Sequence, residues 1–463
     1  MTQPSRLRTA KSPMTRARLT LFAIFLFCIV ISAVWAAIVR RGAHSQVTMT
    51  DLAPIYYGSL CALHRQDPYS PATVSRVFTA DGGIFPKPLD PSNPRDVGTA
   101  KAIATIITVV VNLPTMLFLA IPFAMLPWPI AQLLWTSLMA VLLALAAFLA
   151  WDLAAEKAPV VAACLAGFML ATSEILMWNG NAAGMVASLC VIAAWCFLRR
   201  RFAWIGVVLL ATGLVIKPHD AGFPWLYFLL AGGVLRKRAL QTLAVAGSLG
   251  LAAALWIAPA SPHWIEELHQ NLRSEAAFGG VADPGPTGTS SRGVGPIIDL
   301  QAALSILRNN PRFYNPVSYV VSGCLILAWV LVTLRKRFSR QGASLALAAI
   351  SALLLLPVYH RPYDARILLL ALPGCALLWA AGGRRRWLAL ILTAAAIVVT
   401  SDLPLLLLFI LTRNLFISPS TLGGKIMLIL LQPAPLVLLA MGCFYLWVYA
   451  RYGPPQQCQP PPC

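Results

Sequence analysis

Long apolar stretches recur along this chain, and they restrict its fold more than any other feature of the sequence. A segment of about 20 mostly apolar residues is long enough to cross the hydrocarbon core of a bilayer as a helix. Hydrophobic residues make up 59% of the chain and charged residues only 11%, whereas a soluble domain carries about 25% charged residues. The composition therefore excludes an ordinary soluble domain and a disordered chain. It predicts an all-α polytopic membrane protein.

The apolar stretches predict about 12 transmembrane helices. We expect these spans over residues 19–39, 128–151, 158–174, 182–198, 202–216, 221–235, 239–259, 316–334, 342–357, 365–383, 386–411 and 426–449. Residues 1–18 form a basic N-terminus, residues 19–451 one transmembrane domain, and residues 452–463 a disordered Pro/Gln-rich tail. The first apolar run is longer than the core of a signal peptide, so we expect an uncleaved anchor.

The excess of basic residues fixes the expected orientation. The chain has 36 Lys and Arg against 16 Asp and Glu, and cytoplasmic loops of membrane proteins collect Lys and Arg. The clusters 199–201, 236–238, 335–337 and 384–386 all lie inside only if residues 103–126, which contain several prolines, lie at the interface rather than span. Both termini are then cytoplasmic, the outer loops are 40–127, 260–315 and 358–364, and the charge does not predict nucleic-acid binding.

The first outer loop carries a carboxylate followed by aromatic residues. Asp51 lies a few residues beyond the first span, and Tyr56 and Tyr57 follow it at helical spacing. Such a carboxylate can act as a general base beside an aromatic docking surface for a sugar or lipid. The structural alternative is that Asp51 caps the next helix, because Asp is a favoured N-cap residue.

Three further outer turns carry polar residues. Asn179 and Asn181 flank Gly180 between two spans, which indicates either a simple turn or amides that bind hydroxyl or phosphate groups. Lys217 ends a short span before Pro218, where it either reaches the interface or offers its charge to a phosphate. The densest cluster follows residue 357 and contains Tyr359, His360, Arg361 and Tyr363. Ionisable groups at membrane depth are functional candidates, although aromatic and charged interfacial anchors are the structural alternative.

The order of these motifs resembles glycosyltransferase family 87, whose members have the GT-C fold. Four blocks carry the resemblance: Asp51 with Tyr56-Tyr57 and Asp67-Pro68-Tyr69, then Trp178–Asn181, then Lys217-Pro218, then Pro357–Tyr363. The resemblance implies a long first outer loop with interfacial helices. It also implies transfer of a hexose, typically mannose, from a polyprenyl-phosphate donor to a glycolipid, glycan or protein acceptor, with inversion. No cofactor and no metal are then required.

The resemblance also assigns roles to the polar residues. Asp51 would be the general base, favoured over Asp67 because it lies nearer the end of the first span. The donor phosphate and sugar would be bound by Lys217, His360, Arg361, Asn179 and Asn181, and the acceptor or lipid would be contacted by Tyr56, Tyr57, Tyr359 and Tyr363. The site would face the periplasm of a bacterial inner membrane.

Two other function classes fit the same sequence. A polytopic lipid or sugar transporter, or a flippase, would also place polar groups at the membrane boundary, and it would carry charged or broken-helix elements near the midplane. A glycan ligase or polymerase would use a lipid-diphosphate donor and typically a larger outer loop, which residues 260–315 could provide.

Overall fold

The computed structural model describes residues 13–42, 49–88, 90–286, 296–404 and 421–453, and these residues form helices and connecting loops without a strand. The helices are α1 (Pro13–Gly42), α2 (Ala53–Leu63), α3 (Pro71–Ala80), α4 (Pro94–Thr108), α5 (Pro114–Leu119), α6 (Ile121–Ala124), α7 (Trp128–Ala155), α8 (Pro159–Ala171), α9 (Glu174–Asn179), α10 (Ala183–Arg199), α11 (Ala203–Ile216), α12 (Pro218–Leu230), α13 (Gly233–Ile257), α14 (Trp264–Ala276), α15 (Leu300–Leu307), α16 (Pro311–Arg335), α17 (Arg340–Leu353), the 3₁₀ helix η2 (Pro362–Ala371), α18 (Leu372–Ala381), α19 (Gly383–Val399), α21 (Leu422–Leu431) and α22 (Ala434–Arg451).

Six helical segments within the described residues are long and apolar enough to cross a membrane. They cover Arg16–Arg40, Trp128–Ala155, Gly233–Ile257, Pro311–Arg335, Pro362–Ala381 and Ala434–Arg451. Large apolar side chains such as Leu21, Leu251 and Val320 are exposed on α1, α13 and α16. An exposed apolar surface of this kind requires an apolar surrounding, and the protein is an α-helical membrane protein.

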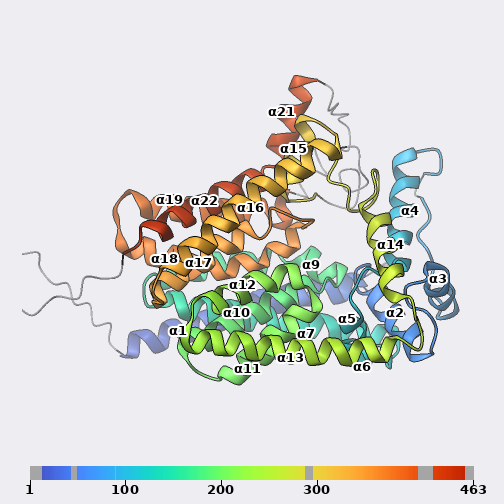
Figure 1. The fold of residues 1–463 in the computed structure, drawn as a ribbon, viewed down its shortest axis with the longest axis horizontal. Coiled ribbons are helices and arrows are strands. Elements are labelled where there is room, and N and C mark those ends of the chain that lie inside the picture. The colour runs from blue at the N-terminus through green and yellow to red at the C-terminus, as the bar shows by residue number, and fades with distance from the viewer. Residues whose placement is uncertain (1–12, 43–48, 89, 287–295, 405–420, 454–463) are drawn as a thin grey trace, which may run out of the picture.

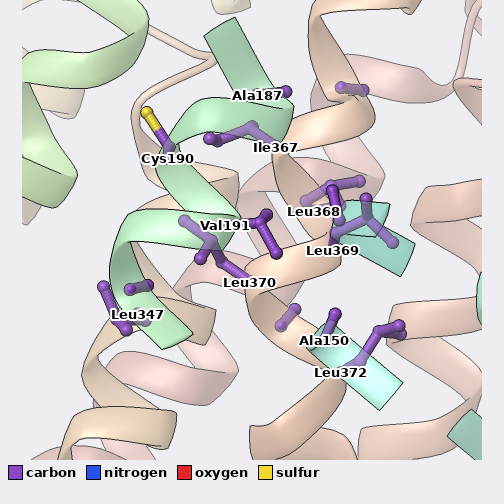
Figure 2. Close-up of a cluster of buried hydrophobic side chains, with 14 of the residues drawn as sticks. Ala150, Ala187, Cys190, Val191, Leu347, Ile367, Leu368, Leu369, Leu370 and Leu372 are labelled. Atoms are coloured by element: carbon purple, nitrogen blue, oxygen red, sulfur yellow. The ribbon is translucent and has the colours of Figure 1, made fainter. Parts of the chain in front are cut away.

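Shorter helices fill the interior between the long ones. Nearly every residue of α10 and α17 is buried, as is most of η2. Figure 2 shows how Val191 of α10, Leu347 of α17 and Leu369 of η2 pack in one apolar cluster that also contains Ala150 of α7. Because these helices are apolar on all sides, they are stable only where other helices or lipid surround them.

The segment between α1 and α7 forms short helices in its described residues. The stretch 103–126 is not one helix, because α4 ends at Thr108 and the short helices α5 and α6 follow. Pro114 and Pro122 stand in the first turns of α5 and α6, where the missing N–H of proline is harmless and its fixed φ starts a new helix. Proline therefore divides this apolar stretch.

The last expected span, over 426–449, is wrong as a single helix. The chain breaks between α21, which ends at Leu431, and α22, which begins at Ala434. Pro433 cannot donate a backbone hydrogen bond, so a helix cannot run through it undisturbed. The expected span 386–411 begins as α19 and ends at Val399, and residues 405–420, the expected tail residues 454–463 and residues 1–12 lie outside the described part of the chain.

The two ends of the bundle differ in character (Figure 1). At one end α1 begins and α22 finishes, and there Arg199 contacts Asp152 at 2.8 Å while Arg16 lies 3.9 Å from the same carboxylate. The short helices α2 to α6 and α14 gather at the other end. The contacts of Arg16 and Arg199 with Asp152 and the short helices α2 to α6 thus lie at different ends of the bundle.

We predict that small residues at the α17–α18 crossing are required for stability. A Cβ atom at Gly374 would lie 2.8 Å from the Ser344 carbonyl oxygen and 2.9 Å from Ala348 Cβ, so Gly374→Ala forces α17 and α18 apart. Overpacking of this kind costs about 1–3 kcal/mol. We expect a lower unfolding temperature in detergent. Gly247→Ala is the control, because a Cβ there meets nothing within 4 Å; equal melting of both variants would contradict the prediction.

Candidate functional site

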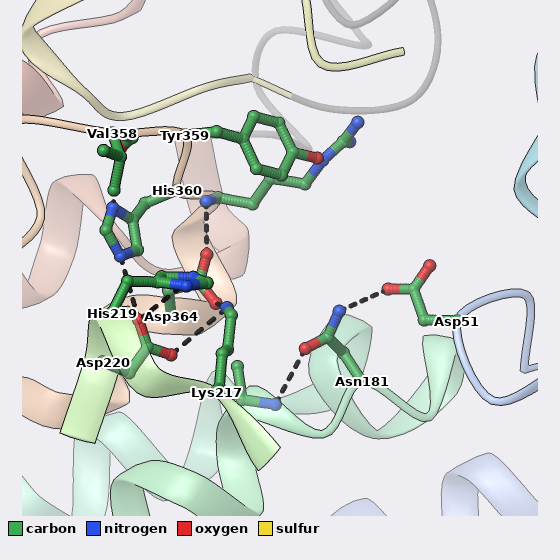
Figure 3. A network of polar contacts seen from close by, with 11 residues as sticks. Asp51, Asn181, Lys217, His219, Asp220, Val358, Tyr359, His360 and Asp364 are labelled. Carbon is green, nitrogen blue, oxygen red and sulfur yellow. Dashed lines mark hydrogen bonds and ion pairs between the residues drawn. The ribbon is translucent and has the colours of Figure 1, made fainter. Parts of the chain in front are cut away.

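Four loop segments that are far apart in the sequence meet at one place. They are residues 49–52 before α2, 178–183 between α9 and α10, 217–220 between α11 and α12, and 357–364 before η2. Figure 3 shows two neighbouring groups of polar contacts, one joining Asp51 to Asn181 and the other centred on Lys217, Asp220, His360 and Asp364. All four segments carry residues that the sequence singled out.

Asp51 is held by Asn181. The Asn181 side-chain amide donates to Asp51 Oδ2 at 2.7 Å, and its carbonyl oxygen accepts the backbone N–H of Ala183 at 2.8 Å. Because the backbone N–H of Ala183 can only donate, the Asn181 oxygen must face it and the NH₂ group must face Asp51. The start of α10 therefore orients the amide, and the amide orients the carboxylate.

The backbone around Asp51 is fixed as well. Its N–H donates to the Asn179 carbonyl at 2.9 Å, and the N–H of Met49 donates to the Trp178 carbonyl at 3.1 Å. Gly180 has φ of 68°, and a Cβ at this position would lie 3.0 Å from the Cβ of Leu52. Glycine is required here both by the left-handed backbone and by the close approach of the two segments.

The structure decides between the two interpretations of Asp51. The N-cap of α2 is Leu52, and no side chain caps that helix, so the interpretation of Asp51 as a helix cap is wrong. Asp67 has a local role instead, because its Oδ1 accepts the backbone N–H of Tyr69 at 2.9 Å. Removal from water raises the pKa of the Asp51 carboxyl, while the hydrogen bond from Asn181 and the positive charge of Arg361 lower it; the first effect prevails.

Lys217 lies between two buried carboxylates. Its Nζ is 3.2 Å from Asp220 Oδ2 and also contacts Asp364 Oδ1. Burial lowers the pKa of Lys217, but the two carboxylates raise it by more. The side chain is therefore a protonated ammonium group. Asp364 in turn accepts the backbone N–H of Arg361 at 2.6 Å at the start of η2. Lys217 thus joins the α11–α12 corner to η2.

His360 is fully buried, and both ring nitrogens have partners. Nδ1 lies 2.8 Å from the Val358 carbonyl oxygen, so it is the protonated nitrogen on that side. Nε2 lies 2.9 Å from Asp220 Oδ1. The ring of His219 packs against His360 with a centroid separation of 5.2 Å. These contacts fix the orientation of the His360 ring.

Arg361 connects the outer loop to this cluster. Its guanidinium donates to the Tyr359 hydroxyl and, at 3.1 Å, to the Val281 carbonyl oxygen in the loop after α14. The positive charge of Arg361 and a hydrogen bond from the Tyr363 side chain both lower the pKa of Asp51, which places these three side chains around the same space. Because Arg361 is buried, the turn 358–364 is not a set of interfacial anchors.

The tyrosines of α2 are placed differently from the other candidates. Tyr56 and Tyr57 are buried, with hydroxyl groups bonded to the Leu126 carbonyl at 2.8 Å and to Asp81 at 3.1 Å. Both rings pack against Trp128. Neither ring is presented on a surface, so contact with an acceptor or lipid stays a prediction for these two residues. Asn179 contributes its backbone carbonyl to Asp51.

Three acidic residues of this region were not chosen as site residues from the sequence. Asp220 and Asp364 lie next to Lys217 and His360, and the strings Lys217–Asp220 and His360–Asp364 were the available signal. Glu275, at the end of α14, gave no signal. Burial raises the pKa of Glu275 to about 7, and the nearby Arg361 opposes that rise.

Comparison with known proteins assigns no function to the chain. No protein-family model, no curated protein and no solved structure matches the chain. The role of each side chain must therefore be argued from its contacts.

We predict that Lys217 is needed for stability as well as function. Lys217→Met leaves the buried Asp220 and Asp364 carboxylates without their shared cation, and removal of one partner from a buried ion pair costs about 3–5 kcal/mol. We expect a clear fall in unfolding temperature, partly restored by a second change, Asp364→Asn. The exposed Lys237→Met is the control. If Lys217→Met unfolds at the wild-type temperature, the ion pairs do not hold the two corners together.

Proposed function

We propose that the protein is a GT-C-type membrane glycosyltransferase that transfers a hexose, mannose by preference, from a polyprenyl-phosphate donor to an acceptor hydroxyl. The observation that carries the proposal is the oriented pair of Asp51 and Asn181 beside the cations Lys217, His360 and Arg361. A base and an anion-binding group side by side are what such a transfer requires.

The contacts of Asp51 support its role as general base. A carboxylate has about four lone-pair sites, and Asn181 and Tyr363 use two of them, so the group can also accept a hydrogen bond from an acceptor hydroxyl. A pKa raised above the ordinary value makes the ionised carboxylate a stronger base. The acceptor oxygen attacks the anomeric carbon as Asp51 takes its proton, and the bond from that carbon to the phosphate oxygen breaks with inversion.

The cationic residues support stabilisation of the leaving phosphate. An ammonium group has three N–H donors, and Asp220 and Asp364 engage two of those of Lys217. His360 and Arg361 add positive charge in the same buried cluster. Electrostatic stabilisation by groups that are already oriented is effective where water is excluded. Asn179 and Asn181 would contact sugar hydroxyls, and Tyr359 and Tyr363 would line the approach of the acceptor or lipid.

The proposed topology has about 12 spans, both termini in the cytoplasm of a bacterium and the site toward the periplasm. The difference between the basic end and the Asp51 end of the bundle supports it. The count is reached if the shorter helices α8, α10, α11, α12, α17 and α19 are added to the six long segments.

A transporter or flippase is the second candidate, and the buried charge cluster supports it. Buried Asp220, Asp364 and His360 beside Lys217 are the kind of ionisable group that lines transport pathways. Incubation of proteoliposomes with labelled polyprenyl-phosphate mannose separates the two. A transferase moves the label to a new covalent product, whereas a transporter leaves the donor intact.

We predict that Asp51→Asn abolishes transfer of label from polyprenyl-phosphate mannose, because the amide cannot take the acceptor proton. General-base catalysis contributes about 10²–10⁴-fold, so the expected loss is of that size. Membrane insertion and unfolding temperature should stay near wild type. Asp67→Asn is the matched control and should keep its activity, because an amide oxygen can also accept from Tyr69. Near-normal transfer by Asp51→Asn would overturn the assignment.

We predict that Asn181→Ala moves the acidic limb of the pH–rate profile to higher pH. Asp51 must be ionised to act as base, so activity is lost as pH falls through its pKa. The Asn181 hydrogen bond lowers that pKa, and its removal therefore raises it. The profile of transfer rate against pH checks this, with Asp67→Asn expected to keep the wild-type limb. A limb that stays in place or moves to lower pH contradicts the role of Asn181.

A further inference from the structure

His219, Asp220 and His360 form a cluster of metal-ligating atoms that the transfer reaction does not explain. One ligand atom from each residue lies within 4.8 Å of the other two. Asp220 Oδ1 is 2.9 Å from His360 Nε2 and 3.7 Å from His219 Nε2. In a tetrahedral zinc site, bond lengths of about 2.0–2.1 Å place neighbouring ligand atoms about 3.4 Å apart. The two separations lie on either side of that value.

The surroundings of two of the three residues are those of metal ligands. His360 donates its Nδ1 proton to the Val358 carbonyl at 2.8 Å, which leaves Nε2 as the nitrogen that faces the cluster. Asp220 presents Oδ2 to Lys217 at 3.2 Å and keeps Oδ1 toward the histidines. Hydrogen-bond and ion-pair partners on the far side of a ligand fix its orientation, and they are a regular part of metal sites.

Charge and access also suit a cation. Asp220 Oδ1 and His360 Nε2 share a proton in their hydrogen bond, and a metal ion bound to both atoms would take the place of that proton. The His219 side chain is 39% exposed while that of His360 is fully buried. A cation can therefore enter on the His219 side, where a small rotation of that ring would close the coordination.

We propose that His219, Asp220 and His360 bind one divalent transition-metal ion, with Zn²⁺ preferred. Two imidazole nitrogens and one carboxylate oxygen suit Zn²⁺, and three protein ligands leave the fourth tetrahedral position open. That position would take a phosphate oxygen, a step that rests on the proposed polyprenyl-phosphate donor. The ion would then act as a Lewis acid on the leaving phosphate. This departs from the expectation of a metal-independent reaction.

Metal content tests the site without any transfer assay. We would purify the full chain in detergent and measure its bound zinc by mass spectrometry, then strip the metal with a chelator and follow Co²⁺ binding by its visible absorption during titration. We expect about one ion per chain and a tetrahedral Co²⁺ spectrum. His219→Gln should weaken Co²⁺ binding at least tenfold without changing the unfolding temperature of the metal-free protein. His269→Gln, which changes an exposed histidine on α14, should bind as wild type does.

The outcomes separate the metal site from the proposed function. Failure to retain zinc, or unchanged binding by His219→Gln, overturns the metal site even if sugar transfer is found. Stoichiometric binding that His219→Gln abolishes supports the site even if no transfer is found. A change in the Co²⁺ spectrum on addition of farnesyl phosphate, but not of inorganic phosphate, supports the open position as a lipid-phosphate site. An unchanged spectrum, or the same change with inorganic phosphate, overturns the proposal that the open position binds a lipid phosphate.

Discussion

The ammonium group of Lys217, shared by Asp220 and Asp364, is the contact on which the rest of the site depends. Two carboxylates cannot stay ionised in a buried place without a cation, because the cost of removing each charge from water is several kcal/mol. The shared cation ties the α11–α12 corner to the start of η2. Asp220 then orients His360, and Asp364 holds the backbone of Arg361. A single lysine thus places the cationic side of the site.

Much of the fold could be predicted from the sequence because the bilayer imposes a simple rule on apolar length. The predicted spans correspond to helices in most cases, and the break of 103–126 followed from its prolines. The division of 426–449 at Pro433 was missed, since hydropathy alone does not register a lost backbone hydrogen bond. The arrangement of the helices depends on contacts between segments distant in the sequence, on which apolar periodicity carries no information.

The candidate site could be predicted only in part, and the reason is sequence distance. Asp51 and Asn181 were both singled out, but their contact joins residues 130 positions apart. The bond between Lys217 and Asp364 spans 147 positions. Tyr56 and Tyr57 were expected on a docking surface, because an aromatic residue near a membrane can either line a surface or pack in the interior. Packing against Trp128 buries them. Residue type thus indicates chemistry, and only the fold decides which groups meet.

The short interior helices explain why charged groups gather here at all. A helix rises about 1.5 Å per residue, so the 14 residues of α11 and of α17 span about 21 Å, less than the hydrocarbon thickness of about 30 Å. A helix of that length that begins at one membrane surface ends within the bilayer, which would place the α11–α12 corner at Lys217 and the connection 354–361 at membrane depth. Irregular backbone at such depth is stable only where it is buried in protein or lines a polar cavity. Lys217, Asp220 and His360 satisfy one another there, and a substrate with a lipid tail and a charged head would meet them without leaving the membrane.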